Sequence, residues 1–206
     1  MSSIATIVML AAGLGTRMKS SLPKVMHPVC GAPLLSHVLA AADGLAANRR
    51  VVVLGHGQGL VQSIVPSGWE VAIQERQRGT GDALLAAAAC IGDGTVLVLS
   101  GDTPLVTTAM LEAFLTAHGQ SGAEATVLTM VLGSPDGYGR VVRDAAGDVA
   151  YIVEHRDATE AERAVDEVNA GMYVLPGRTA LEILREAGTD NEQGELYITD
   201  VVAGLR

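Results

Sequence analysis

The clearest chemical pattern in the sequence is a loop of small residues that follows an apolar run near its start. Residues 5–10 are apolar on both alternating faces, which is typical of a strand covered on both sides in a parallel sheet. Residues 11–13, Ala-Ala-Gly, follow with little side-chain bulk, so a ligand can approach the backbone N–H groups. Arg17 and Lys24 come next. Exposed backbone N–H donors followed by cationic side chains favour the binding of a polyanion, such as the phosphates of a nucleotide.

This loop departs from the two commonest nucleotide motifs. The dinucleotide fingerprint needs a third glycine, but position 18 is Met. The Walker A pattern needs Gly-Lys-Ser/Thr, but Gly15 is followed by Thr16 and Arg17. An ordinary strand-to-helix turn remains the alternative. The local charge favours the phosphate interpretation, because three of the 14 Lys and Arg residues fall within positions 17–24.

A second candidate position is Asp102, which follows the apolar strand predicted over Thr95–Leu99. A carboxylate at a strand end suits Mg²⁺, which takes one or two carboxylates together with phosphate oxygens of the substrate. The alternative is an aspartate that caps a helix or closes a turn. A phosphate-binding loop after the first strand favours the metal-binding interpretation of Asp102.

A third candidate segment is QERQRGTG, which begins at Gln74 and includes Gly79 and Thr80. A glutamine amide offers a donor beside an acceptor, and uracil presents the matching pair. The glycines at positions 79 and 81 would let a flat base lie against the backbone. The alternative is a polar strand end and the turn that starts the next helix.

No general base is evident, and none is needed if the nucleophile is a phosphate. The five histidines lack metal-ligand spacing, and no Ser-His-Asp or Cys-His arrangement is readable. A phosphomonoester is largely dianionic at neutral pH, so it needs positioning and charge neutralisation but no proton removal.

The composition indicates a cytoplasmic globular protein with a substantial core. The 206 residues are 49% hydrophobic and 3% aromatic, which allows a large aliphatic core. A net charge of −9 argues against nonspecific binding to nucleic acid or to an anionic membrane. Cys30 and Cys90 lack metal spacing, so we expect reduced thiols. The first residues lack the basic region of a signal peptide, and no membrane span is evident.

Strand and helix patterns alternate through the first two thirds of the chain, which predicts a mostly parallel sheet with helices on both faces. The expected strands are 5–10, 51–54, 71–74, 95–99 and 125–132, and the expected helices lie near 34–42 and over 82–91 and 107–118. Beyond residue 135 we expect an antiparallel hairpin of strands 140–143 and 149–153, followed by a strand over 168–175. Three further helices are expected over 157–167, capped by Asp157 with Glu160, and over 181–187 and 197–205. We expect one domain, residues 1–206, whose hairpin lobe forms the second wall of a cleft at the strand ends.

The segment LAAGLGTRMKSSLPKVMHPVCGAPLL resembles the sugar-1-phosphate nucleotidyltransferases. More narrowly, it is similar to the N-terminal uridyltransferase domain of bifunctional enzymes that make UDP-N-acetylglucosamine. Further segments agree in order across the chain: LGHG, QERQRGTGDA, SGDTPL, GYGRVVRD, IVEHRDAT, EVNAGMYV and GELYITDV.

The resemblance implies a role for each matching position. Arg17 and Lys24 should face the triphosphate, and Asp102 should bind Mg²⁺. The uracil and ribose should be held by Leu10, Ala11, Ala12, Gly13, Gln74, Gly79 and Thr80. N-acetylglucosamine 1-phosphate should be held by Gly139, Glu154, Asn169 and Thr199. The implied reaction is Mg²⁺-assisted transfer of UMP from UTP to that sugar phosphate, without a covalent intermediate.

Two departures from the family pattern qualify this expectation. Position 100 is Ser, where some relatives have an aromatic residue, so one wall of the sugar pocket should be more open. Family members also continue beyond the point matched by Arg206, with an asparagine that is a second Mg²⁺ ligand and a trimerising β-helix domain. We therefore expect a domain truncated at its C-terminal end, monomeric, with a weakened metal site.

Three rival functions remain open. The same chemistry could act on another sugar phosphate or another nucleoside triphosphate. A catalytically weak regulatory domain could bind a nucleotide sugar, although such domains tend to lose the cations and the metal aspartate that are present here. A nicotinamide-dependent oxidoreductase is disfavoured by Met18.

Overall fold

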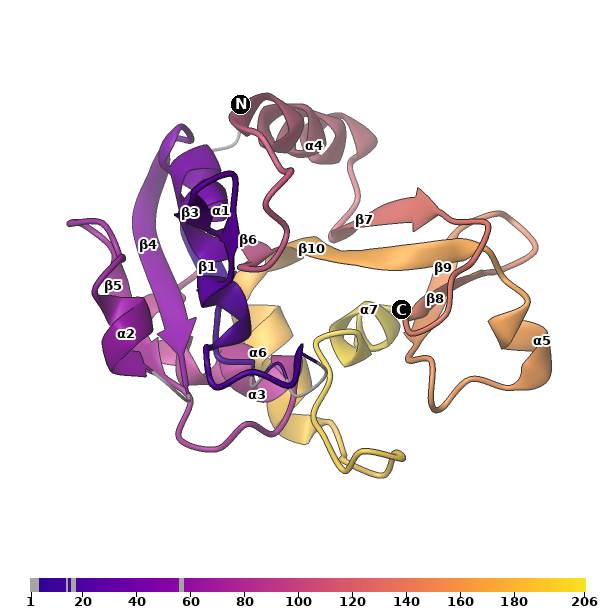
Figure 1. Cartoon of the computed structure of the whole chain (residues 1–206). Helices are drawn as coiled ribbons and strands as arrows, with labels where there is room; N and C mark the ends of the chain where they lie inside the picture. The colour runs from indigo at the N-terminus through magenta and orange to yellow at the C-terminus, as the bar shows by residue number, and fades with distance from the viewer. Residues whose placement is uncertain (1–3, 14, 16–17, 56–57) are drawn as a thin grey trace.

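The architecture is a central sheet with helices on both faces (Figure 1). The structure, a computed structural model, describes residues 4–13, 15, 18–55 and 58–206. Over these residues the sheet follows the order β5-β4-β1-β6-β10-β8-β9, and β7 pairs with β10 off this path. The predicted α/β class, with helices on both faces of the sheet and an antiparallel hairpin, is confirmed. The sheet is mixed, because its parallel pairing is limited to β5, β4, β1 and β6, and the strand expected over 125–132 is antiparallel.

One half of the sheet is parallel, and it contains the first strand of the chain. Its strands are β1 (Ile4–Leu10), β4 (Ala47–Leu54), β5 (Glu70–Ile73) and β6 (Thr95–Ser100). Ile7 and Met9 of β1 point into one hydrophobic cluster and Val8 into the other, so β1 is buried on both faces. The doubly apolar run in the sequence predicted this burial.

The other half is antiparallel and is built on one long strand. β10 (Glu167–Pro176) runs antiparallel to β6, to β7 (Thr126–Val131) and to β8 (Arg140–Arg143). β8 forms a hairpin with β9 (Val149–Val153), at the predicted bounds of both strands. The hairpin and α5 lie at the opposite end of the molecule from β5 and α2 (Figure 1).

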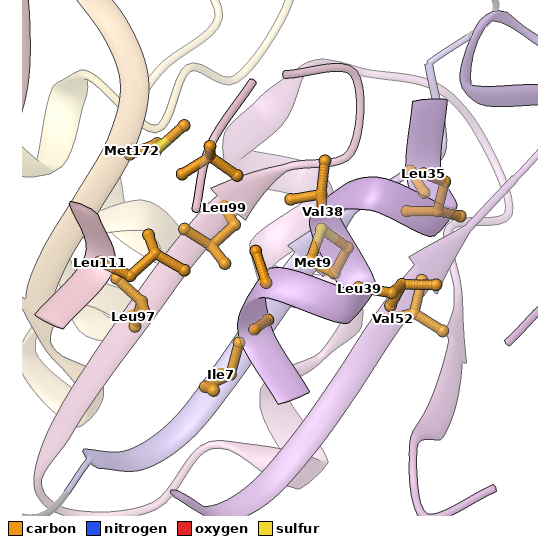
Figure 2. Packing of buried hydrophobic residues seen from close by; sticks show 14 of the residues in the cluster. Ile7, Met9, Leu35, Val38, Leu39, Val52, Leu97, Leu99, Leu111 and Met172 are labelled. Carbon is orange, nitrogen blue, oxygen red and sulfur yellow. The ribbon is translucent and has the colours of Figure 1, made fainter. Parts of the chain in front are cut away.

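The helices divide between the two faces of the sheet. α1 (Leu34–Asp43) and α4 (Thr108–Ser121) cover one face, where Leu35, Val38, Leu39 and Leu111 meet β1, β4 and β6 (Figure 2). α3 (Thr80–Ala86), α6 (Gly177–Glu186) and α7 (Asp200–Gly204) contribute to the cluster on the other face. The remaining elements are η2 (Lys24–Met26), β2 (Pro28–Val29), β3 (Ala32–Pro33), α2 (Gln58–Gln62), η3 (Ala88–Cys90) and α5 (Glu160–Arg163).

Several predicted helices differ from the observed ones. The helix expected over 181–187 spans Gly177–Glu186, and the helix expected over 107–118 continues to Ser121. The helix expected over 82–91 begins at Thr80 and gives way after Ala86 to the 3₁₀ helix η3. The helix expected over 157–167 spans only Glu160–Arg163. The helix expected over 197–205 begins at Asp200. Short apolar runs locate a helix better than they locate its ends.

The predicted cap of α5 was wrong. Thr159 is the N-cap: its hydroxyl accepts from Glu162 N–H, and the Glu162 carboxylate accepts in return from Thr159 N–H, which completes a capping box. Asp157 instead accepts a 2.8 Å hydrogen bond from Glu192 N–H. Its carboxylate therefore ties the segment after β9 to the segment before α7.

None of the helices in the described ranges is both long and apolar enough to cross a membrane.

Candidate active site

A cavity of about 650 Å³ opens at the carboxyl ends of β1 and β6. Nine of the residues that the sequence analysis selected line it: Leu10, Ala11, Ala12, Gly13, Lys24, Gln74, Gly79, Thr80 and Asp102. They come from four separate parts of the chain. The parallel strands bring them together, as expected for a ligand site beyond the carboxyl ends of such strands.

Backbone hydrogen bonds fix the floor of this cavity. Ala11 N–H donates to Val53 O, and Gly101 N–H donates to Leu10 O, both at 2.9 Å. These bonds extend the β4-β1-β6 pairing past the last residue of β1. Ala11 and Ala12 are 4% exposed, whereas Gly13 is exposed and a Cβ added there would meet nothing within 4 Å. The loop therefore turns outward into open space at Gly13.

Lys24 and Asp102 form an ion pair at the edge of the cavity. Gly15 packs directly against Lys24, because a Cβ at position 15 would lie 2.6 Å from Lys24 Cβ. Neither side chain is fully buried: Lys24 is 40% exposed and Asp102 is 27% exposed. Both charges are therefore accessible to a ligand. The predicted catalytic residue Arg17 lies outside the described residues.

Gln74 is buried beneath the cavity, and its amide group is oriented by two acceptors. Its Nε2 donates to Gly79 O at 3.0 Å and to Asp82 Oδ2 at 2.7 Å. A carbonyl and a carboxylate can only accept, so the NH₂ group must face them. Both N–H donors are then used, and the amide offers a ligand its carbonyl oxygen alone. The donor that we expected beside this acceptor is already occupied.

The turn at Gly79 and Thr80 is closed by a segment from near the C-terminus. Gly79 has φ +102°, and a Cβ there would lie 2.3 Å from Leu196 O. Gly81 N–H donates to Leu196 O at 2.8 Å, and Ile198 N–H donates to Thr80 Oγ1 at 3.0 Å. Only glycine fits at position 79, and the turn depends on residues 196–198 for its shape.

The residues expected to hold the sugar phosphate form a second group around β10. Asn169 N–H donates to Gly139 O at 2.9 Å. A Cβ at Gly139 would lie 3.4 Å from a Glu154 carboxylate oxygen, so these two residues are in contact. Thr199 is buried and directly precedes α7, which packs against β9.

The Asn169 side chain is largely engaged within its own strand. Its Oδ1 accepts from Gly171 N–H at 2.9 Å, and its Nδ2 donates to the Tyr173 hydroxyl at 2.6 Å. The pairing of β10 with β7 shifts register between Asn169 and Tyr173, and these bonds span that irregularity. The amide retains one N–H and one lone pair for a ligand.

Glu154 lies in an acidic environment. Burial raises the pKa of its carboxyl, and the nearby carboxylates of Asp157, Asp200 and Glu195 raise that pKa further. Burial also raises the pKa of Tyr197 to about 12. This region is therefore suited to hydroxyl donors, such as those of a sugar, and it disfavours a phosphate.

Arg140 is a fully buried cation next to this acidic group. Its guanidinium donates to Tyr138 O, lies 3.5 Å from His155 Nδ1, and has its Nε without a partner among the described residues. Burying a charge without a carboxylate partner is costly. The hydrogen bond to Tyr138 O fixes the turn that presents Gly139 to Glu154.

Two residues connect the cavity with the group of residues around β10. Ser100 lines the cavity, and its hydroxyl donates to Gly171 O at 3.0 Å. Glu195 also lines the cavity and contributes to the raised pKa of Glu154. Gly139, Glu154, Asn169 and Thr199 themselves do not line it. The predicted residues thus form two adjacent groups.

Sequence reasoning missed several residues of the site. Met18, Val25, Gln77, Ala83 and Glu195 line the cavity but were not selected, and neither was Asp82, the partner of Gln74. All of them lie within segments quoted for the family resemblance, which is the signal that could have identified them.

Comparisons with known proteins identify the family of the chain. Residues 7–196 match the family model of the MobA-like NTP transferase domain. The chain is 49% identical to the bifunctional protein GlmU of Brevibacillus brevis, over 100% of this chain and 45% of that protein. It is 48% identical to the bifunctional protein GlmU of Thermobifida fusca, over 98% of this chain and 44% of that protein. The chain thus spans a little under half the length of these curated relatives.

A solved structure shares the fold at much lower identity. A UDP-glucose pyrophosphorylase complexed with UDP-glucose superimposes with a TM-score of 0.78 at 19% identity. The alignment covers 98% of this chain and 86% of that one. The apo form of a UDP-glucose pyrophosphorylase gives a TM-score of 0.77.

Proposed function

Since the chain belongs to the family of MobA-like NTP transferase domains, we propose that it transfers UMP from UTP to N-acetylglucosamine 1-phosphate. The products are UDP-N-acetylglucosamine and pyrophosphate. The proposal extends to this chain the activity that the motif resemblance implies, and 45–49% identity to GlmU proteins over nearly the whole chain supports it.

The observation that carries the proposal is the composition of the cavity wall. Open backbone at Gly13, the Gln74 carbonyl and the Lys24–Asp102 pair surround one space of about 650 Å³. Such a volume is typical of small-molecule sites. Backbone N–H donors and Lys24 suit phosphates, and the amide oxygen suits the N–H group of a base.

The residues present fit a magnesium ion that is shared with the substrate. No cluster of three or more His, Cys, Asp or Glu side chains in the described ranges could hold a metal alone. Mg²⁺ is usually bound by one or two carboxylates together with substrate phosphates, and Asp102 supplies a carboxylate at the cavity edge. When bound, the ion would neutralise charge on the triphosphate.

The chemistry is an in-line displacement at phosphorus. An oxygen of the sugar phosphate bonds to the α-phosphorus of UTP, and the bond from that phosphorus to the β-bridging oxygen breaks. Pyrophosphate leaves with the electron pair of the broken bond. Because the nucleophile is already anionic, the protein needs to orient it and to balance charge. Lys24 would supply one positive charge. We assign a second to Arg17.

The acidic group would orient the acceptor. Glu154 and Asn169 can bond sugar hydroxyls or the N-acetyl group, while the carboxylates around Glu154 repel a phosphate. The phosphate end of the acceptor is then directed toward Lys24. Glu195 and Ser100 lie between the two groups and mark the path that the acceptor would span.

Pyrophosphate release tests this function. The protein with UTP, N-acetylglucosamine 1-phosphate and Mg²⁺ should release pyrophosphate and form the nucleotide sugar, detected by chromatography. Other sugar phosphates and other nucleoside triphosphates should react at least about tenfold more slowly. Equal rates with another pair would reassign the substrate. Binding of UTP and Mg²⁺ without turnover of any sugar phosphate would indicate a nucleotide-binding domain instead.

A further inference from the structure

The orientation of the Gln74 amide is set by a residue outside the cavity. Gln74 separates the cavity from an outer hollow of about 470 Å³, and it lines both. Asp82 lines the outer hollow but not the cavity. Its 2.7 Å bond to Nε2 therefore holds the NH₂ group on the outer side of the amide.

The reverse orientation of this amide is disfavoured by charge. A flipped Gln74 would place its carbonyl oxygen against Gly79 O and the Asp82 carboxylate, which are both acceptors. Hydrogen bonds to an ionised acceptor are roughly twice as strong as neutral ones. Asp82 is thus the stronger of the two constraints. No donor of a described residue reaches Oε1, which is therefore free to accept from a ligand.

We propose that Asp82 is a positioning residue that sets base selectivity by locking Gln74 with its carbonyl oxygen toward the base. An acceptor at this point favours a base with an N–H group at its pairing edge, such as N3–H of uracil. It disfavours cytosine, whose N3 is an acceptor. This inference rests on the proposed function, because it requires the base of the nucleotide to contact Gln74.

The position of Asp82 suits this role. It lies in the first turn of α3, after the turn at Gly79 that contributes the second acceptor. That turn is tied to Leu196 and Ile198, so Asp82 and Gly79 O both belong to a rigid part of the wall. An acidic side chain is also favourable in the first turn of a helix, which helps to hold Asp82 in place.

The test is the ratio of UTP to CTP binding in Asp82→Asn. An asparagine can donate, so Gln74 can turn its NH₂ group into the cavity, where cytosine N3 accepts from it. The ratio of Kd for CTP to Kd for UTP, measured by calorimetry with Mg²⁺, should fall about tenfold. The ratio of kcat/KM values should fall in parallel. If the substitution only destabilised α3, the binding of both nucleotides would weaken to the same extent.

Two comparisons make the result decisive. Asp93→Asn removes the same charge from an exposed ion pair with Arg178, and it should leave the ratio unchanged. In a Gln74→Ala background, Asp82→Asn should cause no further change, because Asp82 acts only through Gln74. An unchanged ratio in Asp82→Asn alone, or an equal fall in both backgrounds, would overturn the proposal. Failure of the unmodified protein to bind UTP would instead overturn the proposed function.

Discussion

The candidate site has two groups of residues, which we name after the ligands proposed for them. The nucleotide group consists of the selected residues that line the cavity, and the sugar group consists of Gly139, Glu154, Asn169 and Thr199. The two groups are built in different ways. The nucleotide group is assembled from the ends of parallel strands, with open backbone at Gly13 and one ion pair, Lys24–Asp102. The sugar group lies on and next to antiparallel strands, and the Asn169 side chain is already hydrogen-bonded to Tyr173 of the same strand. The first group presents the Gln74 carbonyl oxygen and two accessible charges to the cavity, whereas the Asn169 amide of the second group is largely engaged.

The electrostatic difference between the two groups gives the substrates a direction. Among the described residues, a cation faces the cavity at Lys24, while Glu154, Asp157, Asp200 and Glu195 gather behind it. Under the proposed function, phosphates would be attracted to Lys24 and repelled by these carboxylates. In a protein with a net charge of −9, this separation would help two anionic substrates to meet.

The largest expected effect is a loss of turnover caused by a substitution in the nucleotide group. Asp102→Asn removes the carboxylate that would hold Mg²⁺ and that pairs with Lys24. We expect kcat to fall by about 10²–10³ at saturating Mg²⁺, since charge-stabilising groups commonly have this effect. Pyrophosphate release measures it, and thermal unfolding serves as the control for folding. Undiminished turnover would exclude Asp102 from the metal site.

A pair of glycine variants separates structure from binding within the same group. Gly79→Ala should lower the free energy of unfolding by about 2 kcal/mol or more, because its φ is positive and its Cβ meets Leu196 O. Gly13→Ala, where the Cβ meets nothing within 4 Å, should leave stability nearly unchanged but weaken UTP binding. Urea unfolding and calorimetry measure the two effects. Equal destabilisation by both would contradict this distinction.

The link between the two groups should have a smaller effect. Ser100→Ala removes the 3.0 Å hydrogen bond to Gly171 O, next to the irregularity in β10. We expect a loss of about 1 kcal/mol in unfolding free energy and a larger rise in KM for the sugar phosphate than for UTP. Ser63→Ala, which removes an exposed bond to Leu60 O, is the matched control. Equal changes in both KM values would argue against a link.

The smallest expected effect is a pH dependence in the sugar group. Because the folded state raises the pKa of Glu154, it binds this proton more tightly than the unfolded chain does. Its contribution to stability is complete below about pH 4.3 and is lost as the pH rises through the folded-state pKa. Relative to the unmodified protein, Glu154→Gln should therefore gain stability as the pH rises above about 4.3.

Urea unfolding at several pH values would measure this gain, with Glu112→Gln on the exposed side of α4 as the control. Glu154→Gln should also raise KM for the sugar phosphate, since a charged acceptor is lost. A stability difference that does not vary with pH would show that Glu154 is not strained in the folded state.

Most of the fold could be predicted from the sequence, because its signals are local. Doubly apolar runs identified β1 and β6 as buried strands, and the hairpin of β8 and β9 has the expected bounds. The ends of the helices could not be predicted as well. At α5, both Asp157 and Thr159 are followed by an acidic residue three positions later, and the choice depends on Glu192, which is distant in the sequence.

The site was predictable in part, and the two groups differ here as well. Residues of the nucleotide group carry a chemical pattern of small residues, cations and a strand-end carboxylate. Gly139, Glu154 and Thr199 carry none, and only the family resemblance selected them. The orientation of the Gln74 amide could not be predicted at all, since it depends on the contact with Asp82 that the folded chain creates.

The turn at residues 78–81 has a consequence for how the protein is made. Leu196 N–H donates to Arg78 O at 2.8 Å, and Leu196 O and Ile198 N–H complete the same closure. A chain emerging from the ribosome would expose this turn without its partners until more than 110 further residues had been synthesised. The core strands can pair during synthesis, so the cavity wall at Gly79 and Thr80 is among the last parts of the molecule to form.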